Sequence, residues 1–314
     1  MKRIRFWTRK FYRRAIQEFA SRFYINPEAD SRKSILIAGT ARSGTTWLGD
    51  LLASQIPSRI LFEPFNPDLV PEYRDFHYFQ YLRPETENPE FRAFAHKVFT
   101  GKIRNRWIDR QNERIRSEYR LIKEIRINLA LKWLHDNFPK VPIIFIMRHP
   151  CAVVASRMEL NWATDHDIEP LLSQPDLVTD HLAPYVDLIK DARTDEEKHA
   201  VIWSVSNLVP LKQFNPNEIK IVYYENLCTQ PEIELPAIFE SSGQKYNDEK
   251  TDTVSRPSQT TRLTSAVVDG TDKISAWRKK LSVAQTENIL RVVEAFGLSQ
   301  VYGNSLLPLN NDAI

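Results

Sequence analysis

The residues with the clearest chemical potential form a short turn, GTARSGTT, at positions 39–46. Gly39 and Gly44 allow a tight turn between an apolar stretch and the helical stretch that follows it. The backbone N–H groups of residues 43–46 then converge at the positive end of a helix dipole, where an anion is stabilised. The turn is therefore predicted to bind an anionic group, with Arg42 as a cation inside the loop.

This turn differs from a nucleoside-triphosphate loop in its charge. A Walker loop, GxxxxGK[ST], places a lysine that reaches the outer phosphates where this chain has Thr45, and a hydroxyl for magnesium at the next position. In addition, no convincing acidic partner for Mg²⁺ follows a strand. A phosphotransferase or kinase that uses ATP and magnesium is therefore the alternative hypothesis.

A second candidate for anion binding follows the apolar run PIIFIM. Arg148 comes directly after this run, and Ser156 lies eight residues further on, within a helical stretch. A guanidinium at the end of a strand can bind a phosphate with two parallel hydrogen bonds, and a serine one to two turns into the next helix could add a hydroxyl donor. The two candidates together predict a nucleotide that is held at both of its charged ends.

The two segments resemble the donor-binding motifs of sulfotransferases that use 3′-phosphoadenosine 5′-phosphosulfate (PAPS). GTARSGTTWL is similar to the family's 5′-phosphosulfate loop, and FIMRHPCAVVASR is similar to its 3′-phosphate motif. IVYYENLCTQPEIELPAIFE is similar to a later family segment whose tyrosine lies near the adenine, and RPSQTTR and KISAWRKKL resemble mobile segments that close over the nucleotide. The resemblance spans roughly residues 34–303. It implies that PAPS is bound by Arg42, Ser43, Gly44, Thr45, Thr46, Trp47, Arg148, Ser156, Tyr224 and Arg278, with Lys273 as the alternative to Arg278.

Sulfuryl transfer to a hydroxyl or amine also needs a base and fixed cations, because the acceptor loses a proton while negative charge grows on the departing nucleotide. Family members that act on phenols and steroids use a histidine after the third strand, and LIKEIRI has none. Members that act on carbohydrates can use a glutamate after the second strand, which implies Glu63 as the catalytic base. Lys123 and Arg42 are the candidate catalytic cations, and Arg126 is a lesser candidate for holding an acidic acceptor.

Structural roles remain open for the same side chains. Glu63 could cap or pair with a neighbouring cation, and Lys123 could be half of a structural pair with Glu63 or Glu124. The cluster in TDHDIEP favours a solvated loop over a metal site, since no second histidine lies at ligand spacing. Trp133, Trp162 and Trp203 are expected in the core or in the wall of an acceptor cleft.

Apolar strands alternate with helical stretches along the chain, which predicts a parallel sheet covered on both faces. We therefore expect an α/β protein with a P-loop-like three-layer fold, a central parallel sheet flanked by helices. In such sheets ligands bind beyond the carboxyl ends of the strands. Strands are predicted over 34–39, 59–62, 120–125, 142–147 and 219–224, and helices over 45–54, 128–138 and 152–160.

Charge is concentrated at the start of the chain. Residues 1–24 contain eight Lys or Arg and one acid, Glu18, whereas the net charge of all 314 residues is only +3. Apolar residues recur at helical spacing in the same segment, so it favours a helix packed on the domain with a solvated basic face. Attachment to an anionic membrane surface or to nucleic acid is the alternative. We predict a basic arm or helix at 1–30 and a single sulfotransferase-like domain at 31–314.

The remaining composition limits the class of protein. Cys151 and Cys228 are too few and too far apart for a disulfide framework or a cysteine zinc site. No apolar run approaches the roughly 18 to 20 residues that span a bilayer, so a cytoplasmic protein is expected, with peripheral membrane contact through residues 1–24 as an extension. The main prediction is sulfuryl transfer from PAPS to a carbohydrate or glycolipid, without a metal or nucleic acid. A non-catalytic nucleotide-binding module at an anionic surface is a further alternative.

Overall fold

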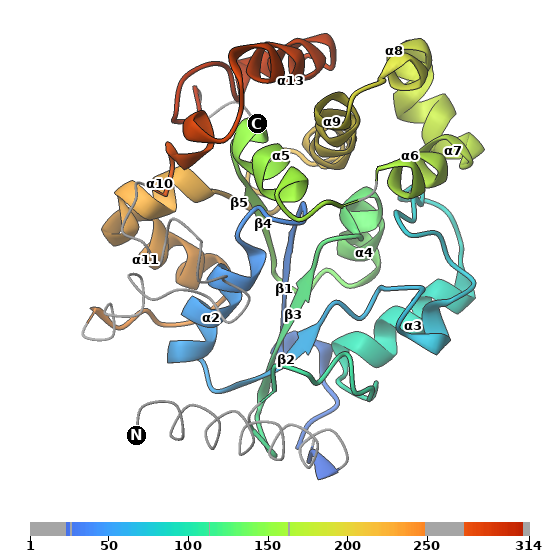
Figure 1. The fold of residues 1–314 in the computed structure, drawn as a ribbon. Helices are drawn as coiled ribbons and strands as arrows, with labels where there is room; N and C mark the ends of the chain where they lie inside the picture. Colours follow the sequence, from blue (N-terminus) through green and yellow to red (C-terminus); the bar gives the residue numbers. More distant parts are fainter. Residues whose placement is uncertain (1–22, 26, 113, 163, 249–272, 310–314) are drawn as a thin grey trace, which may run out of the picture.

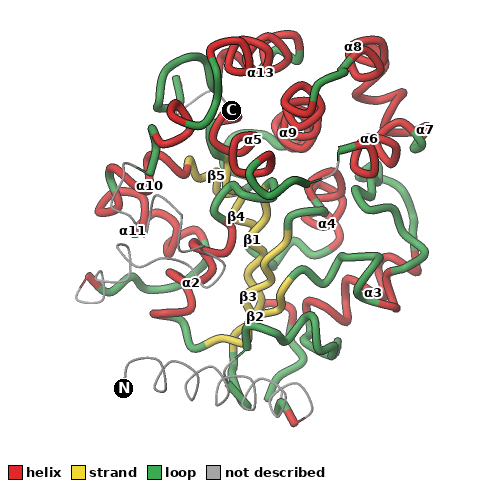
Figure 2. The backbone as a smooth tube through the Cα atoms, viewed as in Figure 1, coloured by secondary structure: helices red, strands yellow, loops and turns green. Residues whose placement is uncertain are grey.

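The protein is built on a five-stranded parallel sheet with strand order β2-β3-β1-β4-β5 (Figures 1 and 2). The computed structural model describes residues 23–25, 27–112, 114–162, 164–248 and 273–309. Because all the strands run in one direction, their carboxyl ends lie at the same edge of the sheet. The strands are β1 (Ser34–Gly39), β2 (Ser58–Phe62), β3 (Tyr119–Glu124), β4 (Ile143–Met147) and β5 (Lys220–Tyr223).

Helices cover both faces of this sheet, which makes three layers (Figure 1). Alternate residues of β1 point into different cores: Ile35 and Ile37 pack with one set of helices, and Leu36 and Ala38 with the other. The first set is α2 (Thr45–Gln55), α10 (Tyr224–Thr229) and α11 (Pro231–Ser241). The second includes α3 (Pro89–Phe99), α4 (Leu131–Asn137), α5 (Pro150–Met158), α9 (Asp195–Gln213) and α13 (Val283–Ala295). The shorter α6 (Asp165–Leu172), α7 (Pro175–Leu177) and α8 (Val186–Asp191) lie between α5 and α9 in the chain. The predicted α/β, P-loop-like three-layer fold is confirmed.

The predicted elements agree with the observed ones to within one or two residues at most ends. The strand predicted at 34–39 has the bounds of β1, and the strand predicted at 219–224 ends at Tyr223 because Tyr224 begins α10. The helix predicted at 128–138 begins as a 3₁₀ turn, Asn128–Ala130, and continues as α4. None of the helices within the described ranges is long and apolar enough to cross a bilayer.

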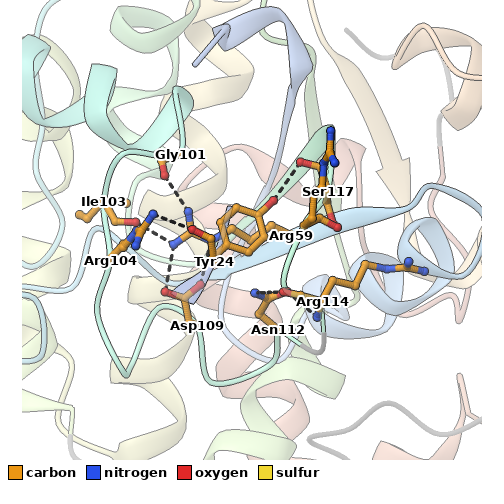
Figure 3. Close-up of polar contacts among 10 residues, drawn as sticks. Tyr24, Arg59, Gly101, Ile103, Arg104, Asp109, Asn112, Arg114 and Ser117 are labelled. Atoms are coloured by element: carbon orange, nitrogen blue, oxygen red, sulfur yellow. Dashed lines mark hydrogen bonds and ion pairs between the residues drawn. The ribbon is translucent and has the colours of Figure 1, made fainter. Parts of the chain in front are cut away.

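A buried ion pair anchors the end of the basic arm to the domain (Figure 3). Arg59 of β2 binds Asp109 through two hydrogen bonds, Nε–Oδ1 at 2.8 Å and NH2–Oδ2 at 2.9 Å, and both side chains are fully buried. The Tyr24 ring lies 4.5 Å from the Arg59 guanidinium, and its hydroxyl donates to the Ser117 carbonyl at 2.9 Å. Residues 1–22 lie outside the described part of the chain, so the division at residue 30 stays a prediction.

Removing the charge of Asp109 should strongly destabilise the protein. Asp109→Asn leaves the Arg59 guanidinium buried without its carboxylate, which typically costs about 3 to 5 kcal/mol. Urea unfolding followed by tryptophan fluorescence would measure this cost. Glu118→Gln is the matched control, because it breaks the more exposed pair between Lys33 and Glu118 and should leave the unfolding midpoint nearly unchanged. Equal shifts for the two variants would contradict the anchoring role of the buried pair.

Candidate active site

The loop between β1 and α2 has the backbone that an anion-binding turn requires. Gly44 is the N-cap of α2 with φ +102°, and Arg42 also has a positive φ, 75°. Ser43 closes the turn, because its N–H and its hydroxyl both donate to the Thr40 carbonyl, at 3.0 and 2.7 Å. A Cβ at Gly39 would lie 2.4 Å from the Ile146 carbonyl oxygen, so that glycine is set by close packing against β4. Gly44 has no side chain to cap the first N–H groups of α2, which suits an anionic ligand there.

We expect Gly44→Ala to destabilise this loop and Gly49→Ala, in the same helix, to be tolerated. At Gly44 an added Cβ would lie 2.6 Å from Tyr224 Cδ2, and the left-handed backbone adds about 1 to 2 kcal/mol for an L-residue. At Gly49 the nearest atom to an added Cβ, Ile37 Cδ1, would be 3.7 Å away, and alanine favours a helix interior. Thermal unfolding of the two variants tests this contrast. Equal unfolding temperatures would show that the loop does not depend on its left-handed glycine.

The two predicted anion-binding segments are joined by hydrogen bonds. Arg42 Nε donates to Ser156 Oγ at 2.9 Å, and Arg148 NH1 donates to the Arg42 carbonyl at 3.1 Å. Arg148 lies directly after β4 and Ser156 in α5, so the ends of two neighbouring strands meet here. Arg148 Nε is buried and has no hydrogen-bond partner among the described residues. An unpartnered buried donor of this kind is favourable only when a ligand or water satisfies it.

Aromatic side chains lie against the same guanidinium. The Tyr224 ring is 4.2 Å from the Arg148 guanidinium and meets the Trp47 ring edge to face, with centroids 5.3 Å apart. Lys273 contributes its carbonyl to Arg148 NH2 at 3.3 Å, and its Nζ lies 5.7 Å from the Trp47 ring centre. Arg278, in contrast, donates to the Asn304 carbonyl at 2.9 Å and lies over Trp277. Of the two predicted alternatives, Lys273 is the one that contacts Arg148 and Trp47.

Glu63 and Lys123 meet at the carboxyl ends of β2 and β3. Lys123 Nζ is 2.5 Å from Glu63 Oε1, and Arg126 NH1 is 2.7 Å from Oε2. Burial opposes ionisation of Glu63, but the two neighbouring cations outweigh it and hold the pKa of this carboxyl below its ordinary value. Burial in turn lowers the pKa of Lys123, against the effect of Glu63. The ion pairing considered from the sequence is therefore present, with Arg126 as a partner in addition to Lys123.

The backbone of Glu63 is unusual for a long side chain. Its φ is 47°, in the left-handed region, where non-glycine residues are uncommon. Two hydrogen bonds hold Glu63 in this conformation: its N–H donates to the Lys123 carbonyl at 2.8 Å, and its carbonyl accepts from Trp107 Nε1 at 3.3 Å. Strained backbone of this kind is concentrated at active sites and ligand clamps. Sequence alone gives no signal for it.

A small cavity that opens to solvent lies beside the loop and Arg126. Most of its lining residues were not predicted from the sequence. One of them, Asp167, lies in the segment TDHDIEP, for which a solvated loop was expected. The segment around Asp167 is not a solvated loop but α6, and Asp167 is buried in an ion pair with Arg157. Asp167 is buried because the buried Arg157 guanidinium would be strongly destabilising without a carboxylate partner. The lining residues are Thr40, Ala41, Tyr78, Phe79, Ile125, Arg126, Arg157, Trp162, Asp167, Ile202 and Ser206.

Other residues singled out in the sequence have local roles. Trp133 and Trp203 are buried in the core, whereas Trp162 lines the cavity. His149 Nδ1 accepts the Cys151 N–H at the start of α5, and Nε2 bonds to the Gly303 carbonyl at 3.1 Å. Burial raises the pKa of the Cys151 thiol to about 12, so this cysteine is not activated. Among the residues that the structure describes, no group of His, Cys, Asp or Glu is arranged to hold a metal ion.

Comparisons with known proteins identify the family. The family model described as "Sulfotransferase family" matches residues 34–248, which is more than half of the chain. The sulfotransferase domain of the Synechococcus PCC 7002 olefin synthase is 17% identical, with coverage of 87% of this chain and 98% of that domain and a TM-score of 0.43. Mouse sulfotransferase SULT7A1, complexed with PAP, is 14% identical, with coverage of 91% of this chain and 90% of the mouse chain and a TM-score of 0.43.

A third structure, the sulfotransferase domain from the curacin biosynthetic pathway, is 17% identical, with coverage of 84% of this chain and 96% of that domain and a TM-score of 0.45. The comparison with curated proteins found no match. At these TM-scores the structural similarity is loose, and the assignment rests on the family model. The chain belongs to the sulfotransferase family and is an enzyme of sulfuryl transfer.

Proposed function

We propose that this sulfotransferase uses PAPS as donor and a hydroxyl or amine of a carbohydrate or glycolipid as acceptor. The observation that carries the donor assignment is the pair of hydrogen bonds through Arg42, which joins the loop after β1 to Arg148 and Ser156. A nucleotide with anionic groups at both ends would be held by both segments at once. Arg148, whose Nε has no hydrogen-bond partner in the ranges that the structure describes, would bind the 3′-phosphate, a group that ATP does not possess.

The remaining contacts to the donor follow from the same geometry. The N–H groups of residues 43–46 and Arg42 would hold the 5′-phosphate and the sulfuryl group at the start of α2. Tyr224 lies against Arg148, and Trp47 packs against Tyr224. Both rings would contact the adenine, and Lys273 would extend the site on that side. The Arg148 Nε has no partner among the described residues, and no side chain caps the start of α2. Both features fit a nucleotide that carries an anionic group at each end.

Glu63 is proposed as the base, and Lys123 and Arg42 as the cations of the transfer step. The acceptor oxygen or nitrogen forms a bond to sulfur while the bond from sulfur to the bridging oxygen of the nucleotide breaks, and the acceptor proton moves to Glu63. Because its pKa is held low, Glu63 is ionised at neutral pH and ready to accept that proton. Lys123, Arg42 and the loop N–H groups stabilise the negative charge on the departing nucleotide. No residue in this scheme requires a metal.

The location of the protein remains part of the proposal. A cytoplasmic enzyme with peripheral contact to an anionic membrane through residues 1–24 would bring it to a glycolipid acceptor, and no nucleic acid is involved. Most of that segment lies outside the described residues. Its last two residues are described: the side chain of Phe23 is exposed, and the Tyr24 hydroxyl is anchored to the Ser117 carbonyl.

Calorimetry with two nucleotides tests the donor assignment. Adenosine 3′,5′-bisphosphate (PAP) should bind much more tightly than ADP, with no effect of magnesium, and labelled sulfate should pass from PAPS to an acceptor fraction. Tighter binding of ATP or ADP in the presence of magnesium would instead favour the phosphotransferase hypothesis. PAP binding without transfer to lipid, glycan or small-molecule fractions of a lysate would favour a non-catalytic module.

A further inference from the structure

We infer that Glu124 is a positioning residue for the proposed base, because its buried carboxylate joins the turn that carries Glu63 to the turn that carries Arg126. This inference rests on the proposed function, since it concerns the residue that would take the acceptor proton. Glu124 is the last residue of β3 and is fully buried. The two turns follow the paired strands β2 and β3 at the carboxyl edge of the sheet.

The Glu124 carboxylate accepts three backbone N–H groups from these two turns. Oε2 accepts the N–H of Phe65 at 2.9 Å, and Oε1 accepts those of Ile125 at 2.8 Å and Arg126 at 3.1 Å. An ionised carboxylate has two acceptor oxygens and no donor, whereas an amide would turn its NH₂ group toward one of the turns. The charge is costly here, since burial raises the pKa of Glu124 above its ordinary value. A carboxylate at this position therefore serves to hold both turns at once.

The turn after β2 needs such an anchor because its backbone is strained. Glu63 has a φ of 47° and precedes Pro64, whereas a residue before proline prefers an extended backbone. Strain of this kind persists only where the surroundings fix it. Pro64 has no N–H, so the first donor after Glu63 is the Phe65 N–H that Glu124 accepts. The Phe65 ring is buried and meets the Tyr73 ring edge to face, so the chain is fixed on this side of Glu63.

The second carboxylate oxygen fixes the partner of the base. It accepts the backbone N–H of Arg126, while the Arg126 guanidinium bonds to Glu63 Oε2 at 2.7 Å and lies 4.0 Å from Glu124 Oε1. The same guanidinium lies 4.7 Å from the Tyr78 ring centre, and Lys123 binds the other oxygen of Glu63. A small shift of either turn would thus misdirect the Glu63 carboxylate. A misplacement of about 1 Å can slow a reaction about 100-fold.

Glu124→Asp tests this role, because it keeps the charge and shortens the reach. Aspartate can still accept the Arg126 N–H in a local turn, but it is one methylene too short for Phe65. Turnover at saturating PAPS should fall by about 10- to 100-fold, while the KM for PAPS and the PAP affinity stay within about twofold. The assay uses labelled PAPS and the lysate fraction that takes most label from the wild-type enzyme, and each rate is divided by the concentration of PAP-binding protein. Glu118→Gln is the control and should not change turnover.

A double variant separates positioning from general support of the site. If Glu124 acts through Glu63, Glu63→Gln/Glu124→Asp should be as slow as Glu63→Gln alone. A residue that supports the whole site would slow both backgrounds by the same factor, and that result would overturn the inference. Wild-type turnover in Glu124→Asp would also overturn it. Loss of PAP binding in both Glu124→Asp and Glu124→Gln would assign the residue to folding and contradict the inference as well.

Failure of the proposed function gives a different result. Wild-type turnover in Glu63→Gln would remove Glu63 as the base, whatever Glu124→Asp does. A slow Glu63→Gln together with a fast Glu124→Asp would leave the base in place and refute the positioning role alone.

Discussion

Replacing Arg148 with alanine is expected to remove the preference of the protein for PAP over ADP. Arg148 is placed directly after β4, and its NH1 and NH2 groups are fixed by the carbonyls of Arg42 and Lys273. This leaves a buried, pre-oriented Nε that has no partner in the described part of the chain. A hydrogen bond to a charged group contributes about 1.5 to 3 kcal/mol. PAP affinity should therefore fall by roughly 10 to 150-fold, as measured by calorimetry, while ADP affinity changes little.

Comparing PAP with ADP separates two roles of Arg148: direct binding of the 3′-phosphate and structural support of the loop after β1. Arg148 also holds the Arg42 carbonyl, so its loss could loosen the loop after β1 and weaken every nucleotide equally. An equal fall in PAP and ADP affinity would assign Arg148 to that structural role. Arg148→Lys should be intermediate, because lysine keeps the charge but cannot form two parallel hydrogen bonds. Arg193→Ala, at an exposed arginine between α8 and α9, should change neither affinity.

The sheet and the proximity of the two predicted anion-binding segments could be predicted from the sequence because both depend on local patterns. SILIAG is apolar throughout and is buried at every position of β1, so the strand and its end are plain in the sequence. Gly39, Gly44 and Arg148 then follow strand ends, and a parallel sheet brings all such positions to one edge. Their proximity thus follows once the fold class is known.

The cavity beside Arg126 could not be predicted, because its walls are assembled from distant segments. Tyr78 and Phe79 come from a long loop and Asp167 from α6. No regular spacing in the sequence indicates that these three residues line one cavity. Asp167 in particular is buried only because Arg157 reaches it. The long helix α9 was also missed: it is buried over most of its length, so its sequence lacks the contrast of apolar and polar faces that marks an amphipathic helix.

Replacing Glu63 with glutamine should reduce turnover by about 10²- to 10⁴-fold, the usual contribution of a general base, while PAP affinity stays within about twofold. The amide keeps the shape of the side chain but cannot accept the proton at neutral pH. Steady-state kinetics with labelled PAPS and calorimetry with PAP provide the two measurements. Glu118→Gln is the control, because it removes an exposed carboxylate that pairs with Lys33 before the start of β3, at the opposite end of this strand from Lys123. It should keep most of the turnover.

The pairing with Lys123 makes this prediction sharper. Lys123 can neutralise the Glu63 carboxylate or the charge that develops on the departing nucleotide, but its single ammonium group cannot fully serve both. If Lys123 turns to the nucleotide in the proposed reaction, Glu63 loses one of the two cations that hold its pKa low and should become a better base, so the two groups would act as one unit. The double variant Glu63→Gln/Lys123→Met should then be no slower than the slower single variant. If Glu63→Gln lost PAP affinity as severely as Arg148→Ala, or turned over as fast as Glu118→Gln, Glu63 would not be the base.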